Sequence, residues 1–447
     1  MGDNSKVNSM NWNQLLSVKR LGLEGVNQSS RKRTEFQRDY DRVIFSSPFR
    51  RLQNKTQVFP LPGSVFVHNR LTHSLEVASV GRSLGAILAD SLETRLSDNI
   101  LIREIPSIIA TACLAHDMGN PPFGHSGEAV MSRYFTSKEK EYKQLFSDEE
   151  WADITHFEGN ANTLRLLAHQ FSGRVEGGLR LTYSTLASII KYPCSAENGH
   201  NKTNIHRKKY GYFQVDKPIF DKLAKELGLI AIDEQGSYVR HPLVYLVEAA
   251  DDICYTIIDI EDAHRLGVLS YQETYDLLFN FIEKVSENLK RTLNELKNDQ
   301  NEQIAVLRAT AIGALIQQCG DAFIKHEEEI LHGEFNQALD NCLTGSVKEA
   351  YAAIRKISPD RIYNARQVIE VELAGHKVLA GLMEEFIPAI LNPDDEISKK
   401  YIFLIPKQFQ TDSTSPYLRV MAVLDFISGM TDLYAVDLYR KIKGLSL

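Results

Sequence analysis

The 447-residue chain has few cysteines, no long apolar run and no excess of positive charge. Its five cysteines are an odd number, are widely spaced and include no CxxC pair, as is typical of reduced thiols in the cytoplasm. No run of about 18 apolar residues occurs, so we expect no transmembrane helix. The first residues, MGDNSKVNSMNW, lack the apolar segment of a secretory signal. We therefore expect a cytoplasmic protein without a membrane partner.

Positive charge is also scarce, because 51 lysines and arginines face 58 aspartates and glutamates, giving a net charge of −7. This balance argues against a generally basic protein that binds nucleic acids or membrane surfaces. A phosphate-binding site in this acidic protein must therefore bring cationic side chains and a metal ion together locally. The P-loop sequence GxxxxGK[ST] is absent as well, which argues against an enzyme of that class.

Helical periodicity is what the sequence does contain. Apolar residues recur with a spacing close to 3.6 from Ser74 to Leu96, and the segment from Ile102 to His116 is apolar on most sides, like a buried helix. That helix must end at HDMGNPPFGH, because glycine and two prolines forbid its continuation. Further helices are predicted at 158–167, 242–266, 271–296, 302–319, 367–386 and 417–442. The few strand signals, at 211–215 and 238–239, predict a small β-hairpin in a mainly α fold.

The His116–Asp117 pair at the end of the apolar helix is the sharpest local feature. An ionisable pair at a buried position costs several kcal/mol if nothing compensates it. A divalent cation compensates it well, by taking an imidazole nitrogen and a carboxylate oxygen from adjacent residues. One such pair is weak evidence, but His73 in RLTHSLEV and Asp251 in YLVEAADDICYTIIDIEDA provide two more candidate ligands.

The predicted helix around Asp251 carries a ridge of functional side chains. Asp251, Tyr255 and Asp259 are spaced i, i+4 and i+8, so they share one helical face. A carboxylate, a phenol and a second carboxylate suit a metal ligand followed by phosphate and sugar contacts. Spacing alone leaves two alternatives open: the ridge is a solvated acidic stripe, and His73 is an ordinary core histidine.

Longer strings carry a family resemblance between about residues 32 and 265. These strings are FRRLQNKTQVFP, HNRLTHSLEV, HDMGNPPFGHSGE, HFEGNANTLRLL, KYP and YLVEAADDICYTIIDIEDA. Together they closely resemble the deoxynucleoside triphosphate triphosphohydrolases, the dGTPase family of the HD superfamily. SGMTD near the C-terminus resembles the tail of that family. The resemblance implies an HD-domain helical core with additional C-terminal helices. We accordingly expect an N-terminal arm at 1–35, the HD-type metal phosphohydrolase core at 36–268, and a helical region at 269–447 packed on it.

The resemblance implies four metal ligands, His73, His116, Asp117 and Asp251. Two imidazoles and two carboxylates suit Mn²⁺, Mg²⁺ or a related transition metal with open positions for water and phosphate. The family reaction is hydrolysis of a dNTP, dGTP included, at the α-phosphate, which releases a deoxynucleoside and intact tripolyphosphate.

Three further residues match catalytic positions of the family. His125 and Glu128 would form a His–carboxylate pair, in which the carboxylate orients the ring and the ring moves a proton to or from the reacting oxygens. His156 in HFEGN matches another active-site histidine, expected to contact phosphate. Without the resemblance, His125 would be interpreted as a turn cap and His156 as a helix-end residue.

Substrate contacts follow from the same resemblance. A triphosphate carries about four negative charges, so cationic partners are required besides the metal. The expected contacts are a phosphate set of Arg70, Lys191, Tyr192 and Tyr255, and a sugar set of Gln57 and Asp259. A close wall at Gln57 would exclude a 2′-hydroxyl group. Base recognition stays open, with Arg419 and the loop 195–210 as candidates.

The resemblance also implies partners. Relatives are hexamers or tetramers, some require an activating nucleotide, and some bind single-stranded DNA. We therefore expect a homo-oligomer and a dNTP substrate, with a nucleotide effector as an option. The net charge argues against broad DNA affinity, although Arg207, Lys208, Lys209 and Tyr210 could form a small patch.

Two other classes of protein compete with the dNTP triphosphohydrolase. Another HD phosphohydrolase, such as a nucleotidase acting on nucleoside monophosphates, would share the four metal ligands, but it would have no reason to carry HDMGNPPFGHSGE, KYP and the tyrosine–aspartate ridge together. A non-catalytic protein on a decayed HD core would be expected to have lost ligands, yet all are present. Product analysis separates these classes.

Overall fold

The computed structural model describes residues 9–25, 33–58, 68–96 and 98–445. Within these ranges it contains 21 α-helices and no extended sheet, so the predicted mainly α fold is confirmed. None of the helices in this part of the chain is long and apolar enough to cross a membrane.

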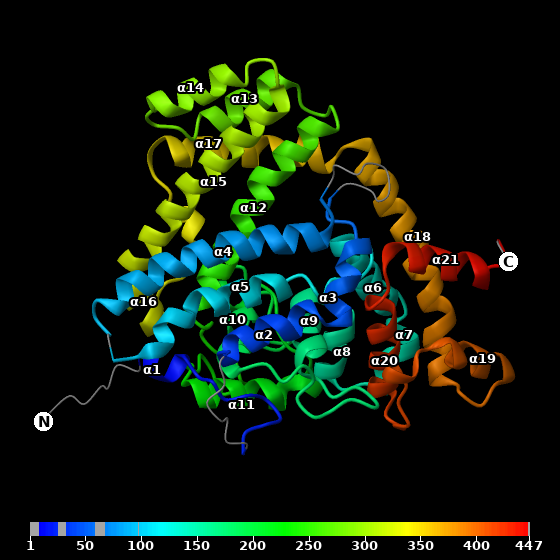
Figure 1. Ribbon diagram of the computed structural model, residues 1–447. Helices are drawn as coiled ribbons and strands as arrows, with labels where there is room; N and C mark the ends of the chain where they lie inside the picture. The colour runs from blue at the N-terminus through cyan, green and yellow to red at the C-terminus, as the bar shows by residue number, and fades with distance from the viewer. Residues whose placement is uncertain (1–8, 26–32, 59–67, 97, 446–447) are drawn as a thin grey trace, which may run out of the picture.

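Three long helices form the centre of the molecule (Figure 1). These are α4 (Arg70–Glu93), α5 (Ile105–Ala115) and α12 (Leu243–Arg265). Above them in the view lies a group of green and yellow helices, α13 (Tyr271–Phe279), α14 (Glu287–Glu295), α15 (Gln300–Lys325) and α17 (Gly345–Ser358). To the right lie α18 (Arg366–Leu391), α19 (Glu396–Leu404), α20 (Pro416–Ser428) and α21 (Asp432–Ile442).

The remaining helices complete the body around and below this centre. They are α1 (Trp12–Leu15), α2 (Glu35–Ile44), α3 (Ser47–Arg51), α6 (Gly124–Ser137), α7 (Glu139–Tyr142), α8 (Asp148–Thr155), α9 (Gly159–Ala168), α10 (Tyr183–Ile189), α11 (Lys217–Leu227) and α16 (Glu327–His332).

Two hydrophobic clusters hold these helices together. The larger one contains the apolar faces of α4, α5, α12 and α15, and the smaller one those of α6, α18, α20 and α21. The chain crosses from the first cluster to the second between Met118 and Val130, through the HDMGNPPFGH segment. The sequence that carries the candidate ligands therefore lies where the two clusters meet.

Local signals decide where several helices begin and end. Helix α4 begins at Arg70, four residues before the predicted start, because Asn69 caps it by accepting a hydrogen bond from the Thr72 backbone N–H at 3.0 Å. This places His73 inside the first turn. The predicted helix 271–296 is divided into α13 and α14, and the predicted helix 417–442 is divided into α20 and α21.

The predicted β-hairpin was wrong. Residues Gln214–Asp216 form a 3₁₀-helix, and Tyr238 makes only an isolated bridge with Ala231. The two predicted strands do not pair with each other, and each makes a hydrogen bond to residues 193–194. The Gly211 N–H donates to the Cys194 carbonyl at 3.1 Å, and the Tyr238 N–H donates to the Pro193 carbonyl at 2.9 Å. The aromatic side chains that suggested strands reflect burial in the core, not pairing.

The described part of the N-terminal segment packs on its own chain. The indole N–H of Trp12 donates to Glu327 at 2.9 Å, and the backbone N–H of Met10 donates to the Leu331 carbonyl at 2.9 Å. Arg20 is fully buried and donates to Asp39 at 2.5 Å. These contacts join residues 9–25 to α16 and α2.

Gly81 makes the close packing of α4 on α5 possible. A Cβ at this position would lie 2.5 Å from the Cys113 sulfur and 3.0 Å from an Ile109 methyl group.

We expect Gly81→Ala to lower the free energy of unfolding by about 1–3 kcal/mol, since the overpacked core outweighs the gain in helix propensity. Gly313→Ala is the matched control, because that helical glycine of α15 faces open space, and it should stabilise by about 0.5–1 kcal/mol. Urea unfolding measures both, and equal stabilisation would contradict this packing.

Candidate active site

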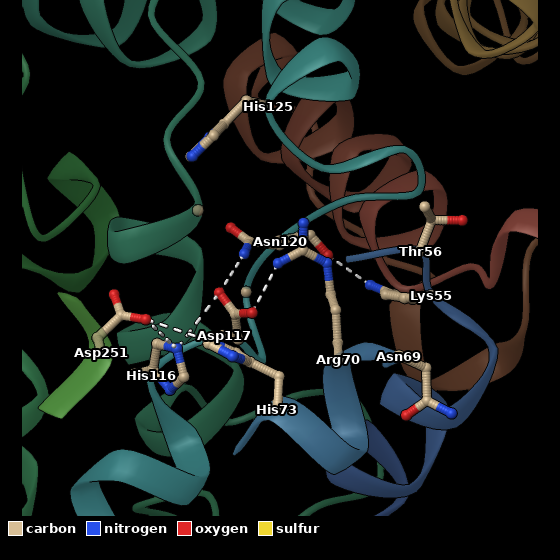
Figure 2. Close-up of polar contacts among 12 residues, drawn as sticks. Lys55, Thr56, Asn69, Arg70, His73, His116, Asp117, Asn120, His125 and Asp251 are labelled. Carbon is tan, nitrogen blue, oxygen red and sulfur yellow. Dashed lines mark hydrogen bonds and ion pairs between the residues drawn. The ribbon is translucent and has the colours of Figure 1, made fainter. Parts of the chain in front are cut away.

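Four side chains from three segments converge at the buried end of α5 (Figure 2). His73 comes from α4, His116 and Asp117 follow α5, and Asp251 lies on α12. Oδ1 of Asp251 lies 3.1 Å from Nε2 of His73 and 3.4 Å from Nε2 of His116. One ligand atom each of His73, His116 and Asp117 lies within 4.8 Å of the others. This spacing could hold one metal ion.

The loop after α5 is shaped by close contact with α9. A Cβ on Gly119 would lie 2.1 Å from the Gly159 carbonyl oxygen, so only glycine fits. The Gly119 N–H donates to the Thr163 hydroxyl at 3.0 Å, and the Asn162 amide donates to the Gly119 carbonyl at 2.7 Å. The glycine and proline signals in the sequence thus mark a turn that is fixed by tertiary contacts.

The orientation of His116 suits a metal ligand. Its Nδ1 lies 2.6 Å from the Cys113 carbonyl oxygen, which can only accept a hydrogen bond, so Nδ1 carries the proton and Nε2 faces the site. Nε2 is buried and makes no hydrogen bond to any described residue. Burial lowers the pKa of His116, but the charges of Asp117 and Asp251 outweigh it and raise the pKa to about 9. The site therefore favours the protonated, positively charged form of His116.

Asp117 is held by two donors in addition to the imidazoles. Arg70 donates to its Oδ2 at 2.6 Å, and Asn120 donates to its Oδ1 at 2.5 Å (Figure 2). Burial opposes ionisation of Asp117, yet Arg70 and the neighbouring histidines lower its pKa to about 2. Burial likewise opposes ionisation of Asp251, while His116 and His73 hold its pKa well below the usual range. Both carboxylates are therefore anionic at neutral pH.

Two hollows, of about 260 and 440 Å³, meet over this group and share Asp117, Asn120, His125 and Asp251 as lining. The smaller hollow has the cations of Lys191 and Lys209 and the Tyr192 hydroxyl in its wall, together with the Glu248 carboxylate. The larger one contains Gln57, Arg70, Tyr255, Tyr363 and Val368. The fold thus joins a polar compartment with two lysines and a more aromatic compartment at the candidate metal group.

His125 and Glu128 form the predicted pair. Nδ1 of His125 donates to Oε2 of Glu128 at 2.8 Å, and the other carboxylate oxygen accepts from the Gly159 backbone N–H at 2.9 Å. The hydrogen bond to Glu128 and its charge raise the pKa of His125. Burial opposes ionisation of Glu128, but His125 lowers its pKa. The exposed ring lies at the N-terminus of α6, apart from the metal group in the view of Figure 2.

Four of the predicted residues line neither hollow directly: His73 and Glu128, described above, and His156 and Asp259. His156 is exposed, and its ring lies tilted against the ring of His200, with ring centres 4.6 Å apart. Its Nδ1 lies 3.1 Å from the Ala152 carbonyl oxygen. Asp259 is buried and accepts a hydrogen bond from the Tyr363 hydroxyl at 2.9 Å. Burial raises the pKa of Asp259 to about 8. Tyr363 also stacks on Tyr255, with ring centres 5.5 Å apart, so Asp259 is connected to the larger hollow through Tyr363.

Lys191 faces the site together with a counter-ion. Its ammonium group lies 3.1 Å from Oε1 of Glu248, whose other oxygen accepts from Arg240 at 2.6 Å. Burial lowers the pKa of Lys191, but Glu248 outweighs it and the pKa is raised well above the ordinary value. Lys191 is therefore a permanent cation at the wall of the smaller hollow.

Comparison with known proteins agrees with this architecture. Residues 70–175 match the HD domain, and residues 341–441 match the phosphohydrolase-associated domain. The chain is 37% identical to a deoxyguanosinetriphosphate triphosphohydrolase-like protein of a Synechocystis species, over 98% of this chain and 100% of that protein. A protein of the same name from Listeria innocua is 36% identical over 98% of this chain and 100% of its own length. The deoxyguanosinetriphosphate triphosphohydrolase of Yersinia enterocolitica is 29% identical, with 91% and 93% covered.

The chain belongs to the dGTPase family of the HD superfamily. The HD match contains three of the four converging side chains, whereas Asp251 lies beyond it. The phosphohydrolase-associated match contains Tyr363, which the sequence analysis did not select. Asn120 and Lys209 were missed as well, although HDMGNPPFGH and RKKY drew attention to both segments. No sequence signal marked Tyr363, because its role depends on stacking against a residue 108 positions earlier in this dGTPase-family chain.

The SGMTD segment of this dGTPase-family chain, residues 428–432, makes hydrogen bonds to both loops that border the site. Oδ2 of Asp432 accepts from the Thr56 backbone N–H at 2.8 Å, and its Oδ1 accepts from the Phe123 backbone N–H at 3.1 Å. Lys55 donates to the carbonyls of Asn120 at 2.5 Å and Ser428 at 2.8 Å. The C-terminal helices thereby fix the segments that carry Gln57 and His125.

Replacing Asp432 tests whether its hydrogen bonds to the two loops stabilise the fold. We expect Asp432→Asn to lower the free energy of unfolding by about 1–3 kcal/mol, because an amide NH₂ group replaces one acceptor and leaves a buried N–H unpaired. Asp437→Asn is the matched control, since Asp437 is exposed on the same helix. Chemical denaturation measures both variants. Equal free energies of unfolding in the two variants would contradict this role of Asp432.

Proposed function

We propose that the chain hydrolyses dNTPs, dGTP among them, at the α-phosphate to give a deoxynucleoside and tripolyphosphate. The observation that carries this proposal is the meeting of a hollow that contains two lysines and a more aromatic hollow over His116, Asp117 and Asp251. A nucleotide placed across this junction has its α-phosphate at the candidate metal group. The names of the full-length relatives support the same substrate class.

In this proposal His73, His116, Asp117 and Asp251 hold one divalent ion, which is Mn²⁺, Mg²⁺ or a related ion. The buried Nε2 of His116 makes no hydrogen bond to a described residue and lies 3.4 Å from Asp251, and together with the two ionised carboxylates it fits such an ion. When bound, the metal supplies Lewis acidity to the phosphate and lowers the pKa of a coordinated water. The protein holds the ligand atoms ready through Cys113, Arg70 and Asn120.

The smaller hollow suits the rest of the triphosphate. Lys191 and Lys209 provide fixed positive charge, and the Tyr192 hydroxyl provides a donor. Arg70 donates to Asp117 in this structure, but its buried Nε–H has no hydrogen-bond partner among the described residues, so it retains a donor for phosphate. These cations offset part of the triphosphate charge that the metal leaves.

The larger hollow suits the deoxyribose and the base. The buried Oε1 of Gln57 has no hydrogen-bond partner among the described residues and can accept from a ligand there. Tyr255 and Tyr363 form a stacked wall, behind which Asp259 would orient the sugar hydroxyl contacts through Tyr363. Val368 and Val371 add apolar surface for the base.

Proton transfer is proposed for His125, with Glu128 holding the ring in orientation. His125 lines both hollows, so it can reach the phosphate oxygens at their junction. The phosphate contact of His156 stays a prediction. So do the domain boundaries, the cytoplasmic location, the hexameric or tetrameric assembly, the effector nucleotide and any single-stranded DNA binding.

The competing function is a nucleotidase that acts on nucleoside monophosphates. A monophosphate would leave the hollow around Lys191 and Lys209 unused, which favours the triphosphate. Incubating the Mn²⁺-loaded protein with dGTP and dGMP, and separating the products by anion-exchange chromatography, decides between them. Tripolyphosphate with deoxyguanosine supports the proposal, whereas phosphate from dGMP alone would refute it.

Asp117 gives the sharpest test of the metal group. We expect Asp117→Ala to lose bound metal and hydrolysis while its far-ultraviolet circular dichroism stays helical, because the variant removes an ionised ligand at the surface of the hollows. Metal content by mass spectrometry and turnover of dGTP measure the two effects. The control is Asp437→Asn, which should retain both. Full turnover by Asp117→Ala would remove Asp117 from the ligand set.

The His125–Glu128 pair predicts a pH dependence. Glu128 raises the pKa of His125, so the protonated ring persists above the ordinary histidine pKa, and activity that needs this proton is lost as the pH rises through the raised value. Glu128→Gln removes the negative charge and should move the alkaline limb of kcat/KM to lower pH. Glu149→Gln, at an exposed position of α8, is the control. An unmoved limb in Glu128→Gln would show that another group donates the proton.

A further inference from the structure

Arg240 is a fully buried cation behind the smaller hollow of the candidate active site. It lies just before α12, and it is not among the residues that line the hollow. A guanidinium without access to water is unfavourable unless its partners compensate the charge. The partners of Arg240 therefore indicate what the fold uses this charge for.

One carboxylate joins Arg240 to the hollow. Oε2 of Glu248 accepts a hydrogen bond from Nη1 of Arg240 at 2.6 Å, and its Oε1 lies 3.1 Å from the ammonium nitrogen of Lys191. Glu248 and Lys191 both line the smaller hollow. Burial opposes ionisation of Glu248, but Lys191 and Arg240 lower its pKa to about 2, so it is anionic at neutral pH. The carboxylate thus bridges a buried cation and a cation that faces the hollow.

This bridge decides how much positive charge the wall of the hollow retains. Lys191 and Glu248 alone would form a neutral pair, and the carboxylate would repel a phosphate that enters the hollow. Burial lowers the pKa of Arg240, but Glu248 outweighs burial and raises it, so Arg240 stays charged. Within this group of three, two cations and one carboxylate leave one net positive charge.

Arg240 also holds the segment that carries the second lysine of the hollow. Its Nη2 donates to the Ile205 carbonyl at 2.6 Å, and its backbone N–H donates to Nδ1 of His206 at 3.3 Å. Burial and the charge of Arg240 lower the pKa of His206 to about 3, so the ring is neutral and its Nδ1 can accept. Lys209 follows shortly after in the sequence and lines the same hollow. One guanidinium therefore supports the segments of both lysines.

Two tyrosine rings complete the environment of Arg240. Its guanidinium carbon lies 5.7 Å from the centre of the Tyr192 ring and 5.1 Å from that of the Tyr245 ring, distances typical of cation–π contacts. The ammonium nitrogen of Lys191 lies 5.9 Å from the centre of the same Tyr192 ring. Tyr245 is fixed in turn, because its hydroxyl donates to the Phe335 carbonyl at 2.6 Å. Arg240 thus also contacts Tyr192, the hydroxyl donor of the hollow.

We propose that Arg240 is a positioning residue for the phosphate chain of the substrate. It neutralises Glu248, which leaves the charge of Lys191 available to phosphate, and it holds both lysine-bearing segments in the wall of the hollow. Arg240 acts through these groups and does not touch the substrate itself. This inference rests on the proposed function, because that function assigns the smaller hollow to the phosphates.

Steady-state kinetics of the Mn²⁺-loaded, full-length protein with dGTP test this role. We expect Arg240→Gln to raise KM about 10-fold and to change kcat less than about 3-fold, because the phosphates in this hollow lie away from the cleaved bond. The double variant Arg240→Gln/Glu248→Gln also removes the uncompensated carboxylate, so its KM should return to within about 3-fold of the wild-type value. An arginine that only stabilised the fold would not be rescued in this way.

Arg20→Gln is the matched control for the loss of a buried, ion-paired arginine. Arg20 is 1% exposed and pairs with Asp39, but it lines neither hollow of the candidate active site. We expect this variant to lose stability and to keep the wild-type KM. Thermal unfolding by circular dichroism confirms that each variant is folded at the assay temperature.

Titration calorimetry with inorganic tripolyphosphate in EDTA gives the same comparison without catalysis. We expect the Kd to rise about 10-fold in Arg240→Gln and to recover in the double variant. Glu248→Gln alone leaves no unpaired carboxylate, so it should fold even if Arg240→Gln does not. Because it keeps both cations of the bridge, it should bind tripolyphosphate about 3-fold more tightly than wild type.

These outcomes separate the role of Arg240 from the proposed function. Absence of dGTP hydrolysis together with the expected order of Kd values would refute the proposed function alone. Hydrolysis with equal KM and Kd in Arg240→Gln and wild type would refute the role of Arg240 alone. A double variant no better than Arg240→Gln, an equal rise of KM in Arg20→Gln, or weaker tripolyphosphate binding by Glu248→Gln would also overturn that role.

Discussion

Two ionised carboxylates, Asp117 and Asp251, face two imidazoles at the buried end of an apolar helix. Negative charge at such a depth requires a positive partner, because water cannot solvate it fully. His73, His116 and Arg70 provide part of that partner, and Nε2 of His116 faces the same carboxylates without a hydrogen bond to a described residue. The surrounding contacts, from the Cys113 carbonyl to the Asn120 amide, keep these groups in one arrangement.

The rest of the fold can be understood as support for this charge arrangement. The ligands come from helices of the larger hydrophobic cluster, whereas His125 begins a helix of the smaller one. The segment between them is fixed by Gly119 against α9 and by Asp432 from the C-terminal tail. The C-terminal helices, which match the phosphohydrolase-associated domain, therefore contribute to the geometry of the site even though they provide none of its four candidate ligands.

The distribution of cations around the molecule follows the same electrostatic logic. In this acidic chain, arginines and lysines line both the candidate active site and a hollow beside α3. At the candidate active site, Lys191 and Lys209 each have a carboxylate partner, which keeps them charged and in place. At the hollow beside α3, Arg51 has no carboxylate partner among the described residues.

The sequence by itself determined the mainly α fold and the candidate ligands, because helical periodicity and the HDMGNPPFGH turn are local properties. The resemblance to the dGTPase family indicated the His125–Glu128 pair as well, and both residues lie in the first turns of α6. The sequence pattern failed for the β-hairpin, since aromatic residues selected for burial resemble strand residues. Only the tertiary structure decided that Tyr363 backs Asp259, that Asp432 holds both loops, and that His156 faces outward. Those outcomes depend on contacts between residues tens to hundreds of positions apart, which no local pattern encodes.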